Sequence, residues 1–141
     1  MSKVRDLVEG RTLNFIVQES TVADAARRMA ELRCGAILVL KDGQLKGIFS
    51  ERDLMRRVVL AKLDPETVTV GSVMSTDLAV IDESASIEAA MEAMLAHNCR
   101  HLPVMSGSQV VAFLSVRDLM NFELARKTEE LLHMRAYIQG V

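Results

Sequence analysis

The chain has 141 residues, half of them hydrophobic and 26% charged, with a formal net charge of −2 at pH 7. This composition supports a core, but no basic cluster is dense enough for a nucleic-acid surface, so we expect no DNA or RNA partner. No apolar run approaches the roughly 20 residues of a membrane span. The first ten residues hold no apolar signal core, so we expect a cytoplasmic protein with no membrane partner.

The first half of the chain predicts a strand, a helix, two strands and a second helix. The helix is indicated by apolar residues that recur at helical spacing from Val22 to Leu32, after the capping residue Thr21. The second helix follows Ser50. The three strands are predicted by apolar runs at residues 14–18, 36–40 and 45–49. Residues 41–44 form the turn of the hairpin between the last two strands.

The second half repeats this order. Residues 8–55 align with residues 73–120 without a gap, at a constant offset of 65. A helix is expected from Ile87 to about Leu95, and another follows Ser115. We therefore predict an α+β fold, in which two pseudo-symmetric β-α-β-β-α subdomains pack sheet to sheet. The corresponding strands and turn are residues 79–82, 101–105, 110–114 and the turn at 106–109.

The connecting segment and the end of the chain complete the organisation. We divide the chain into repeat 1 (residues 1–62), repeat 2 (residues 63–122) and a helical tail (residues 123–141). Pro65 breaks the helix that precedes it. Residues 116–138 predict one long helix with an imperfect apolar stripe, which needs a packing partner, and a second subunit is the simplest one.

The same Ser-x-x-Asp pattern begins the last helix of each copy, as Ser50 and Asp53 and as Ser115 and Asp118. At a strand-to-helix junction this pattern forms a capping box, in which the two side chains satisfy the free backbone N–H groups. That structural interpretation does not explain why Arg, Leu and Met recur with the pattern. A helix N-terminus also favours anions, and a carboxylate there can accept hydrogen bonds from a ribose diol.

The pattern of glycine, two apolar residues and Ser-x-x-Asp, together with "CRHLPVM" in the second copy, resembles a tandem pair of cystathionine-β-synthase (CBS) domains. The resemblance is to the free-standing bacterial Bateman module and covers about residues 3–122. It implies a homodimer that binds AMP, ADP or ATP, and less often NADH or S-adenosylmethionine, in clefts between the repeats. It also implies regulation of a separate, unidentified protein target, with no catalysis and no catalytic cofactor.

The resemblance also implies roles for individual residues. Asp53 and Asp118 bind ribose hydroxyls, and Ser50 and Ser115 assist at the sugar or phosphate. Arg100 and His101 contact phosphate, and Arg52 and Arg117 are further nucleotide-binding candidates. The cleft closed by Asp118 is expected to be lined by Asn14, Gly35, Ala36, Phe113 and Ser115. The cleft closed by Asp53 is expected to be lined by Ala79, Arg100, His101, Ile48 and Ser50.

Two differences between the copies predict unequal clefts. Gly35 and Ala36 occupy in repeat 1 the positions that Arg100 and His101 occupy in repeat 2. Ala112 replaces the motif glycine that repeat 1 has at Gly47. If that glycine lets a ligand or a backbone segment approach closely, the Asp118 cleft binds weakly or not at all.

Three functions are open from the sequence. The first is an adenosine-nucleotide sensor, and the second is a structural dimerisation or adaptor module with empty clefts, which the capping-box interpretation favours. The third is a redox sensor that uses Cys34 and Cys99, although free cysteines at such positions are more often small buried hydrophobes. No CxxC pair, metal-ligand spacing, nucleophile–base set or glycine-rich phosphate loop is present, so we expect neither a metal site nor an enzyme.

Overall fold

The computed structural model describes residues 2–140 and has two three-stranded sheets, one in each repeat. In each sheet the central strand pairs in parallel with the first strand and antiparallel with the third. Repeat 1 contains α1 (Val4–Val8), β1 (Phe15–Val17), α2 (Val22–Leu32), β2 (Ala36–Lys41), β3 (Gln44–Ser50), α3 (Glu51–Asp53) and η1 (Leu54–Val59). Repeat 2 contains α4 (Val70–Val73), β4 (Ile81–Asp82), α5 (Ile87–His97), β5 (His101–Ser106), β6 (Gln109–Ser115) and α6 (Val116–Ile138).

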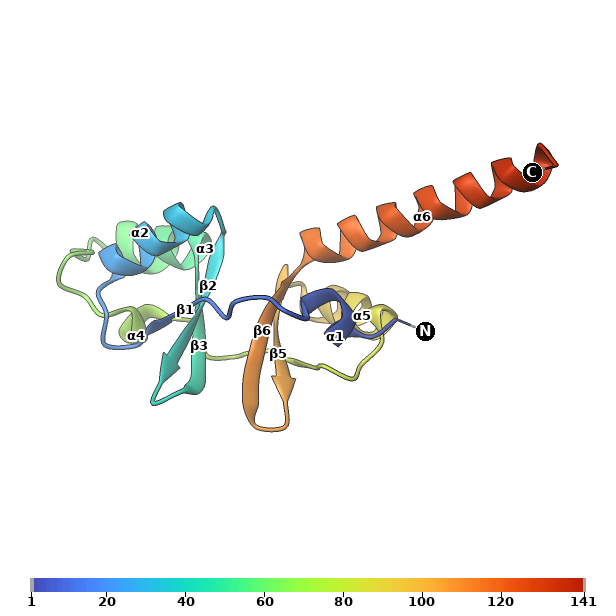
Figure 1. Ribbon diagram of the computed structural model, residues 1–141. Helices are drawn as coiled ribbons and strands as arrows, with labels where there is room; N and C mark the ends of the chain where they lie inside the picture. Colours follow the sequence, from blue (N-terminus) through green and yellow to red (C-terminus); the bar gives the residue numbers. More distant parts are fainter. Residues whose placement is uncertain (1, 141) are drawn as a thin grey trace.

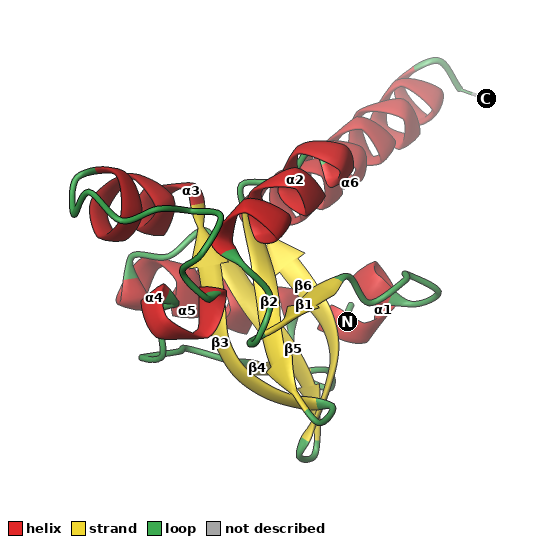
Figure 2. Cartoon of the chain, turned by 90° about the vertical axis from the view of Figure 1, so that its left-hand side faces the viewer, coloured by secondary structure: helices red, strands yellow, loops and turns green. Residues whose placement is uncertain are grey.

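The two sheets stand in the middle of the molecule and the helices cover their outer sides, so the predicted α+β architecture is confirmed (Figures 1 and 2). Leu38 and Leu40 of β2 pack with Val110 of β6 in a cluster that joins the two sheets. Each repeat has a further core between its sheet and its helices. The sheet-to-sheet contact places the ends of β2, β3, β5 and β6 next to one another, and this contact positions the clefts described below.

Local sequence signals account for most of the elements. The Thr21 hydroxyl accepts a hydrogen bond from the Asp24 N–H at the start of α2, and the Ser86 hydroxyl caps α5 in the same way. The hairpin between β2 and β3 turns at Asp42 and Gly43, which both have positive φ. The outer strands β1 and β4 are shorter than expected, because only the residues that pair with the central strand form a ladder.

The two short helices α1 and α4 were not predicted, and each packs on the other repeat. Val4 and Val8 of α1 are buried in the core of repeat 2. Val70 and Val73 of α4 are buried in the core of repeat 1. The division at residue 62 therefore describes the duplicated sequence, whereas each packed subdomain includes the leading helix of the other copy.

The helices after the two capping boxes differ. In repeat 1 a single turn of α-helix, α3, continues as the π-helix η1, whereas in repeat 2 the long α6 is formed as predicted. Figure 1 shows α6 projecting away from the sheets. Its large exposed apolar side chains are Val116, Met120, Leu124, Leu131, Leu132, Met134, Tyr137 and Ile138. The second subunit expected against this helix stays a prediction. Within residues 2–140, no helix has the length and apolarity that crossing a membrane requires.

Candidate functional site

Two clefts lie between the repeats, one beside each Ser-x-x-Asp motif. The Asp118 cleft has a volume of about 330 Å³, and the Asp53 cleft has a volume of about 490 Å³. Among the expected residues, the Asp118 cleft is lined by Asn14, Ala36, Phe113, Ser115 and Asp118. The Asp53 cleft is lined by Ile48, Ser50, Arg52, Asp53, Ala79, Arg100 and His101.

Four placements differ from those expected. Gly35 lines the Asp53 cleft and not the Asp118 cleft. Its carbonyl accepts the Glu51 N–H at 2.9 Å, and a Cβ built on it would lie 3.6 Å from the Glu51 carboxylate, so Gly35 faces the first turn of α3. Arg117 is exposed on α6 and lines neither cleft. His101 and Ala36 each line both clefts, although each was expected in only one of them.

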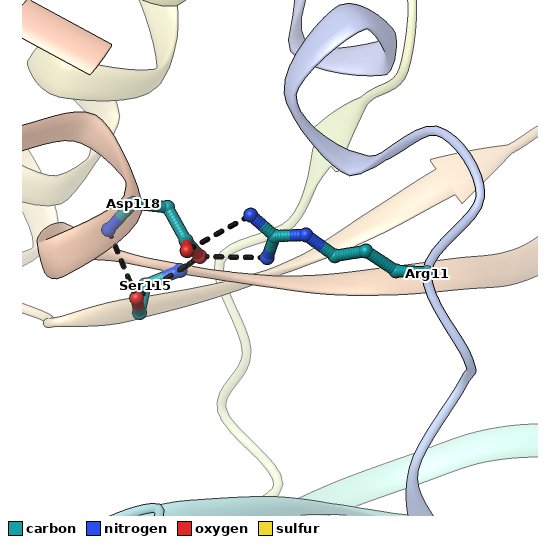
Figure 3. Close-up of polar contacts among 3 residues, drawn as sticks. All are labelled: Arg11, Ser115 and Asp118. Atoms are coloured by element: carbon teal, nitrogen blue, oxygen red, sulfur yellow. Dashed lines mark hydrogen bonds and ion pairs between the residues drawn. The ribbon is translucent and has the colours of Figure 1, made fainter. Parts of the chain in front are cut away.

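Asp118 is held by its capping box and by an arginine that the sequence did not indicate. The Ser115 N–H and hydroxyl donate to one carboxylate oxygen at 2.8 and 3.0 Å, and the Ser115 hydroxyl accepts from the Asp118 N–H at 3.2 Å. The Arg11 guanidinium donates to both carboxylate oxygens, at 3.0 and 2.9 Å (Figure 3). Burial raises the pKa of the Asp118 carboxyl, but hydrogen bonds from Arg11 and Ser115 and the Arg11 charge outweigh burial, so this pKa lies below its usual value.

Asp53 is bound by neutral donors. The Ser50 N–H and hydroxyl both donate to one carboxylate oxygen at 3.0 Å, and the Ser75 hydroxyl donates to the other at 2.9 Å. The nearest guanidinium, that of Arg57, is 3.7 Å from the carboxylate. Asp53 is only 6% exposed, so these hydrogen bonds compensate for the burial of its charge.

Gly47 allows a backbone segment, not a ligand, to approach closely. A Cβ built on Gly47 would lie 2.7 Å from the Ser75 carbonyl oxygen and 2.5 Å from the Met74 sulfur. Ser75 and Ile48 exchange two backbone hydrogen bonds, of 2.9 and 2.8 Å, which hold the connecting segment against β3. Because the glycine serves this contact in repeat 1, Ala112 at the matching position is no argument that the Asp118 cleft is empty.

His101 stands between the two clefts. Its ring stacks on Phe113 with centroids 4.9 Å apart and an interplanar angle of 28°. Burial lowers the pKa of His101, although the Asp118 charge opposes this effect, so the imidazole is favoured in its neutral form. A neutral imidazole can donate one hydrogen bond and accept another. A ligand in either cleft would therefore contact the same ring.

The two cysteines also line the clefts, Cys34 the Asp118 cleft and Cys99 the Asp53 cleft. Both are free and partly buried, and burial raises the pKa of each thiol. A protonated thiol is a poor nucleophile, which does not favour a redox sensor. Among residues 2–140, no group of three or more His, Cys, Asp or Glu side chains is placed to hold a metal ion.

Sequence reasoning missed Arg11 and Ser75, the partners of the two carboxylates. Arg11 is 107 positions from Asp118, and Ser75 is 22 positions from Asp53. Both come from the segment before the first strand of the opposite repeat. No local spacing links such residues, and only the exchanged packing of α1 and α4 brings them to the clefts.

The model of the CBS domain matches residues 4–60 and 70–125. The chain belongs to the CBS-domain family. CBSX3, a mitochondrial CBS domain-containing protein of Arabidopsis thaliana, is 30% identical over 127 residues, which are 86% of this chain and 62% of CBSX3. The chain therefore spans less than two thirds of that relative.

Solved structures of other CBS proteins superpose on the chain. The crystal structure of the CBS domain NE2398 has a TM-score of 0.82 and 32% identity, and the match covers 87% of this chain and 98% of NE2398. CBSX2 in complex with AMP has a TM-score of 0.77 and 23% identity, with 90% of this chain and 99% of CBSX2 covered. The CBSX2 likeness shows the fold alone. The NE2398 match confirms the tandem CBS pair.

Proposed function

We propose that this CBS pair is a regulatory module that binds adenosine-containing nucleotides, chiefly AMP, ADP or ATP, in the clefts between its repeats and signals to a separate protein. The observation that carries the proposal is that both Ser-x-x-Asp boxes line a cleft formed jointly by the two repeats. A capping box alone needs no cleft, and α5 is capped by Ser86 outside both of them. CBSX2, which shares the fold, binds AMP.

The residues of the Asp53 cleft divide into groups that suit the parts of a nucleotide. The Asp53 carboxylate and the Ser50 hydroxyl oxygen offer hydrogen-bond acceptors for the ribose hydroxyls. Ile48 and Ala79 supply apolar surface for the flat base. The guanidiniums of Arg52 and Arg100 supply charge-assisted donors for phosphate.

A ligand in such a cleft can alter the relation between the two repeats. The repeats contact each other through the apolar cluster of Leu38, Leu40 and Val110, and the clefts lie between them. A nucleotide that contacts both repeats favours the arrangement in which its contacts are complete. A partner protein that distinguishes the two arrangements then reads the nucleotide concentration. The signal is carried by a homodimer, for which α6 supplies exposed apolar surface.

The alternative is a structural adaptor with empty clefts. The observation that favours it is that both carboxylates already accept hydrogen bonds within the protein. Under this alternative, the two aspartates stabilise helix starts and nothing else.

The test is a titration of the purified protein with AMP, ADP, ATP, NADH and S-adenosylmethionine, followed by melting temperature and then calorimetry. A ligand at 100 times its dissociation constant should stabilise the protein by about 2.7 kcal/mol. Asp53→Ala and Asp118→Ala should each remove binding at one cleft. The matched control is Ser86→Ala, which should cost about 1 kcal/mol through loss of a cap while leaving nucleotide binding intact.

Three outcomes separate the two functions. A selective shift that is lost in an aspartate variant but kept in Ser86→Ala supports the sensor. If the nucleotide affinity of both aspartate variants equals that of the wild type, the assignment of the two aspartates to nucleotide binding is refuted. Flat titrations of a well-folded protein with all five ligands would favour the adaptor.

A further inference from the structure

The Arg11 guanidinium occupies the place where a ribose diol would meet Asp118. Arg11 itself lines the Asp118 cleft, and its two terminal nitrogens donate to the two carboxylate oxygens at 2.9 and 3.0 Å. One of these oxygens also accepts two hydrogen bonds from Ser115. That oxygen thus accepts three hydrogen bonds and the other accepts one, from Arg11, so of the roughly four lone-pair sites of the carboxylate at most one, on the second oxygen, is free. Two ribose hydroxyls cannot donate to this carboxylate unless Arg11 moves away.

The Asp53 cleft differs at the corresponding point. There the extra donor is the Ser75 hydroxyl, at 2.9 Å from the carboxylate. A hydroxyl can rotate, and it can accept a hydrogen bond from a sugar while it donates to Asp53. A guanidinium can only donate, and its two parallel bonds to a carboxylate are charge-assisted. The Ser75 hydroxyl can therefore stay bound to Asp53 while a sugar binds there. The Arg11 guanidinium, in contrast, must leave Asp118 before a sugar diol can take its place.

We propose that Arg11 competes with the ribose for Asp118, so that the two clefts fill in order, the Asp53 cleft first and the Asp118 cleft only after the Arg11–Asp118 ion pair opens. This inference rests on the proposed function, because it concerns the same clefts and the same class of ligand. The ion pair sets the concentration at which the second nucleoside binds. The protein then responds over two concentration ranges instead of one.

The expected gain in adenosine affinity on removal of Arg11 depends on how far solvent screens the Arg11–Asp118 ion pair. The side chain of Arg11 is 39% exposed and that of Asp118 is 19% exposed, so solvent screens the attraction only in part. Removing the competitor should tighten adenosine binding at the Asp118 cleft about tenfold, which corresponds to about 1.4 kcal/mol. The pair should also weaken with salt, since charges near the surface are screened.

The test uses adenosine, which has no phosphate and no charge, so that Arg11 cannot help to bind it as a phosphate ligand. Calorimetry is performed on the wild-type protein, on Arg11→Gln and on Arg28→Gln, a matched loss of charge at an exposed position on α2. Arg11→Gln should tighten the second binding event about tenfold, and Asp118→Ala in the same background should abolish it. Arg28→Gln should behave as the wild type.

Salt provides a second readout. In the wild type, raising the salt concentration from about 0.05 to 0.5 M should tighten adenosine binding at the Asp118 cleft, because the competing ion pair is screened. In Arg11→Gln the affinity should not change with salt. If Arg11 does not compete with the ribose, adenosine affinity should not depend on salt in either the wild type or Arg11→Gln.

Each other outcome overturns the inference. Equal adenosine affinity in the wild type and Arg11→Gln, with the Asp53 cleft still binding, removes the competition and leaves the proposed function standing. If Arg11→Gln weakens AMP binding and leaves adenosine binding unchanged, Arg11 is a phosphate ligand and not a competitor. If neither protein binds adenosine or AMP at either cleft, the proposed function falls and the competition falls with it.

Discussion

The substitution Gly47→Ala should destabilise the protein and displace the segment that connects the repeats. A Cβ at this position would lie 2.7 Å from the Ser75 carbonyl oxygen, a backbone atom that is held by hydrogen bonds to Ile48. The Met74 sulfur, 2.5 Å away, belongs to a flexible side chain and can move, but the backbone oxygen moves only if those hydrogen bonds lengthen.

Two estimates of the loss agree. Overpacking by one methyl group in a closely packed site typically costs about 1–3 kcal/mol. Breaking the two backbone hydrogen bonds between Ser75 and Ile48 instead would cost about 2 kcal/mol, at about 1 kcal/mol each. For a chain of this size 1 kcal/mol shifts the melting temperature by about 3 °C, so a decrease of about 3–9 °C is expected.

The assay is thermal unfolding followed by circular dichroism, with Gly35→Ala as the matched control. A Cβ on Gly35 would lie 3.6 Å from the Glu51 carboxylate, an ordinary contact, so the control should melt within about 2 °C of the wild type. The reasoning would be refuted if Gly47→Ala melted at the wild-type temperature, or if both variants were destabilised equally.

Three further predictions concern the clefts and the tail. Because the pKa of Asp118 is lowered in the folded state, its contribution to stability is present above its unfolded pKa of about 3.9 and is lost as the pH falls through the folded value. Arg11→Gln should therefore lose less stability than the wild type as the pH falls below about 4, and parallel losses of stability in acid would contradict this. His101→Ala should weaken nucleotide binding at both clefts and Phe113→Ala at the Asp118 cleft alone, a difference that calorimetry resolves. Truncation after residue 125 should leave the melting temperature of dilute protein unchanged but lower the mass of any dimer in light scattering, and an unchanged dimer would exclude the tail as its contact.

The sequence predicted the elements whose signals are local. The capping residues Thr21 and Ser86, the turn at Asp42 and Gly43, and the period of the apolar residues in α2 and α5 all act within a few positions. The duplication extended these predictions, because each element of repeat 1 supports its counterpart in repeat 2. Most candidate residues line the cleft in which they were expected, since strand ends and helix starts determine where they lie, and their roles in binding stay predictions.

The remaining features depend on contacts between distant parts of the chain. The helices α1 and α4 have five and four residues, too few for a periodic pattern. Their exchange between repeats is what brings Arg11 and Ser75 to the carboxylates. Gly35 was expected in the Asp118 cleft but lines the Asp53 cleft, where its carbonyl accepts the Glu51 N–H, a contact that the sequence pattern did not indicate.

The exchanged leading helices have a consequence for the order in which the protein can fold during synthesis. The Val70 N–H donates to the Ser20 carbonyl, so repeat 1 receives its last structural segment only after the connecting segment has been translated. The Val4 N–H donates to the Ala85 carbonyl, so repeat 2 depends on residues that are translated before repeat 1. Helix α1 therefore keeps two apolar valines uncovered until repeat 2 has been translated. A ribosome-bound fragment that ends near residue 62 would therefore lack α4 over its core while it exposed α1, which makes the nascent half-chain a target for chaperones.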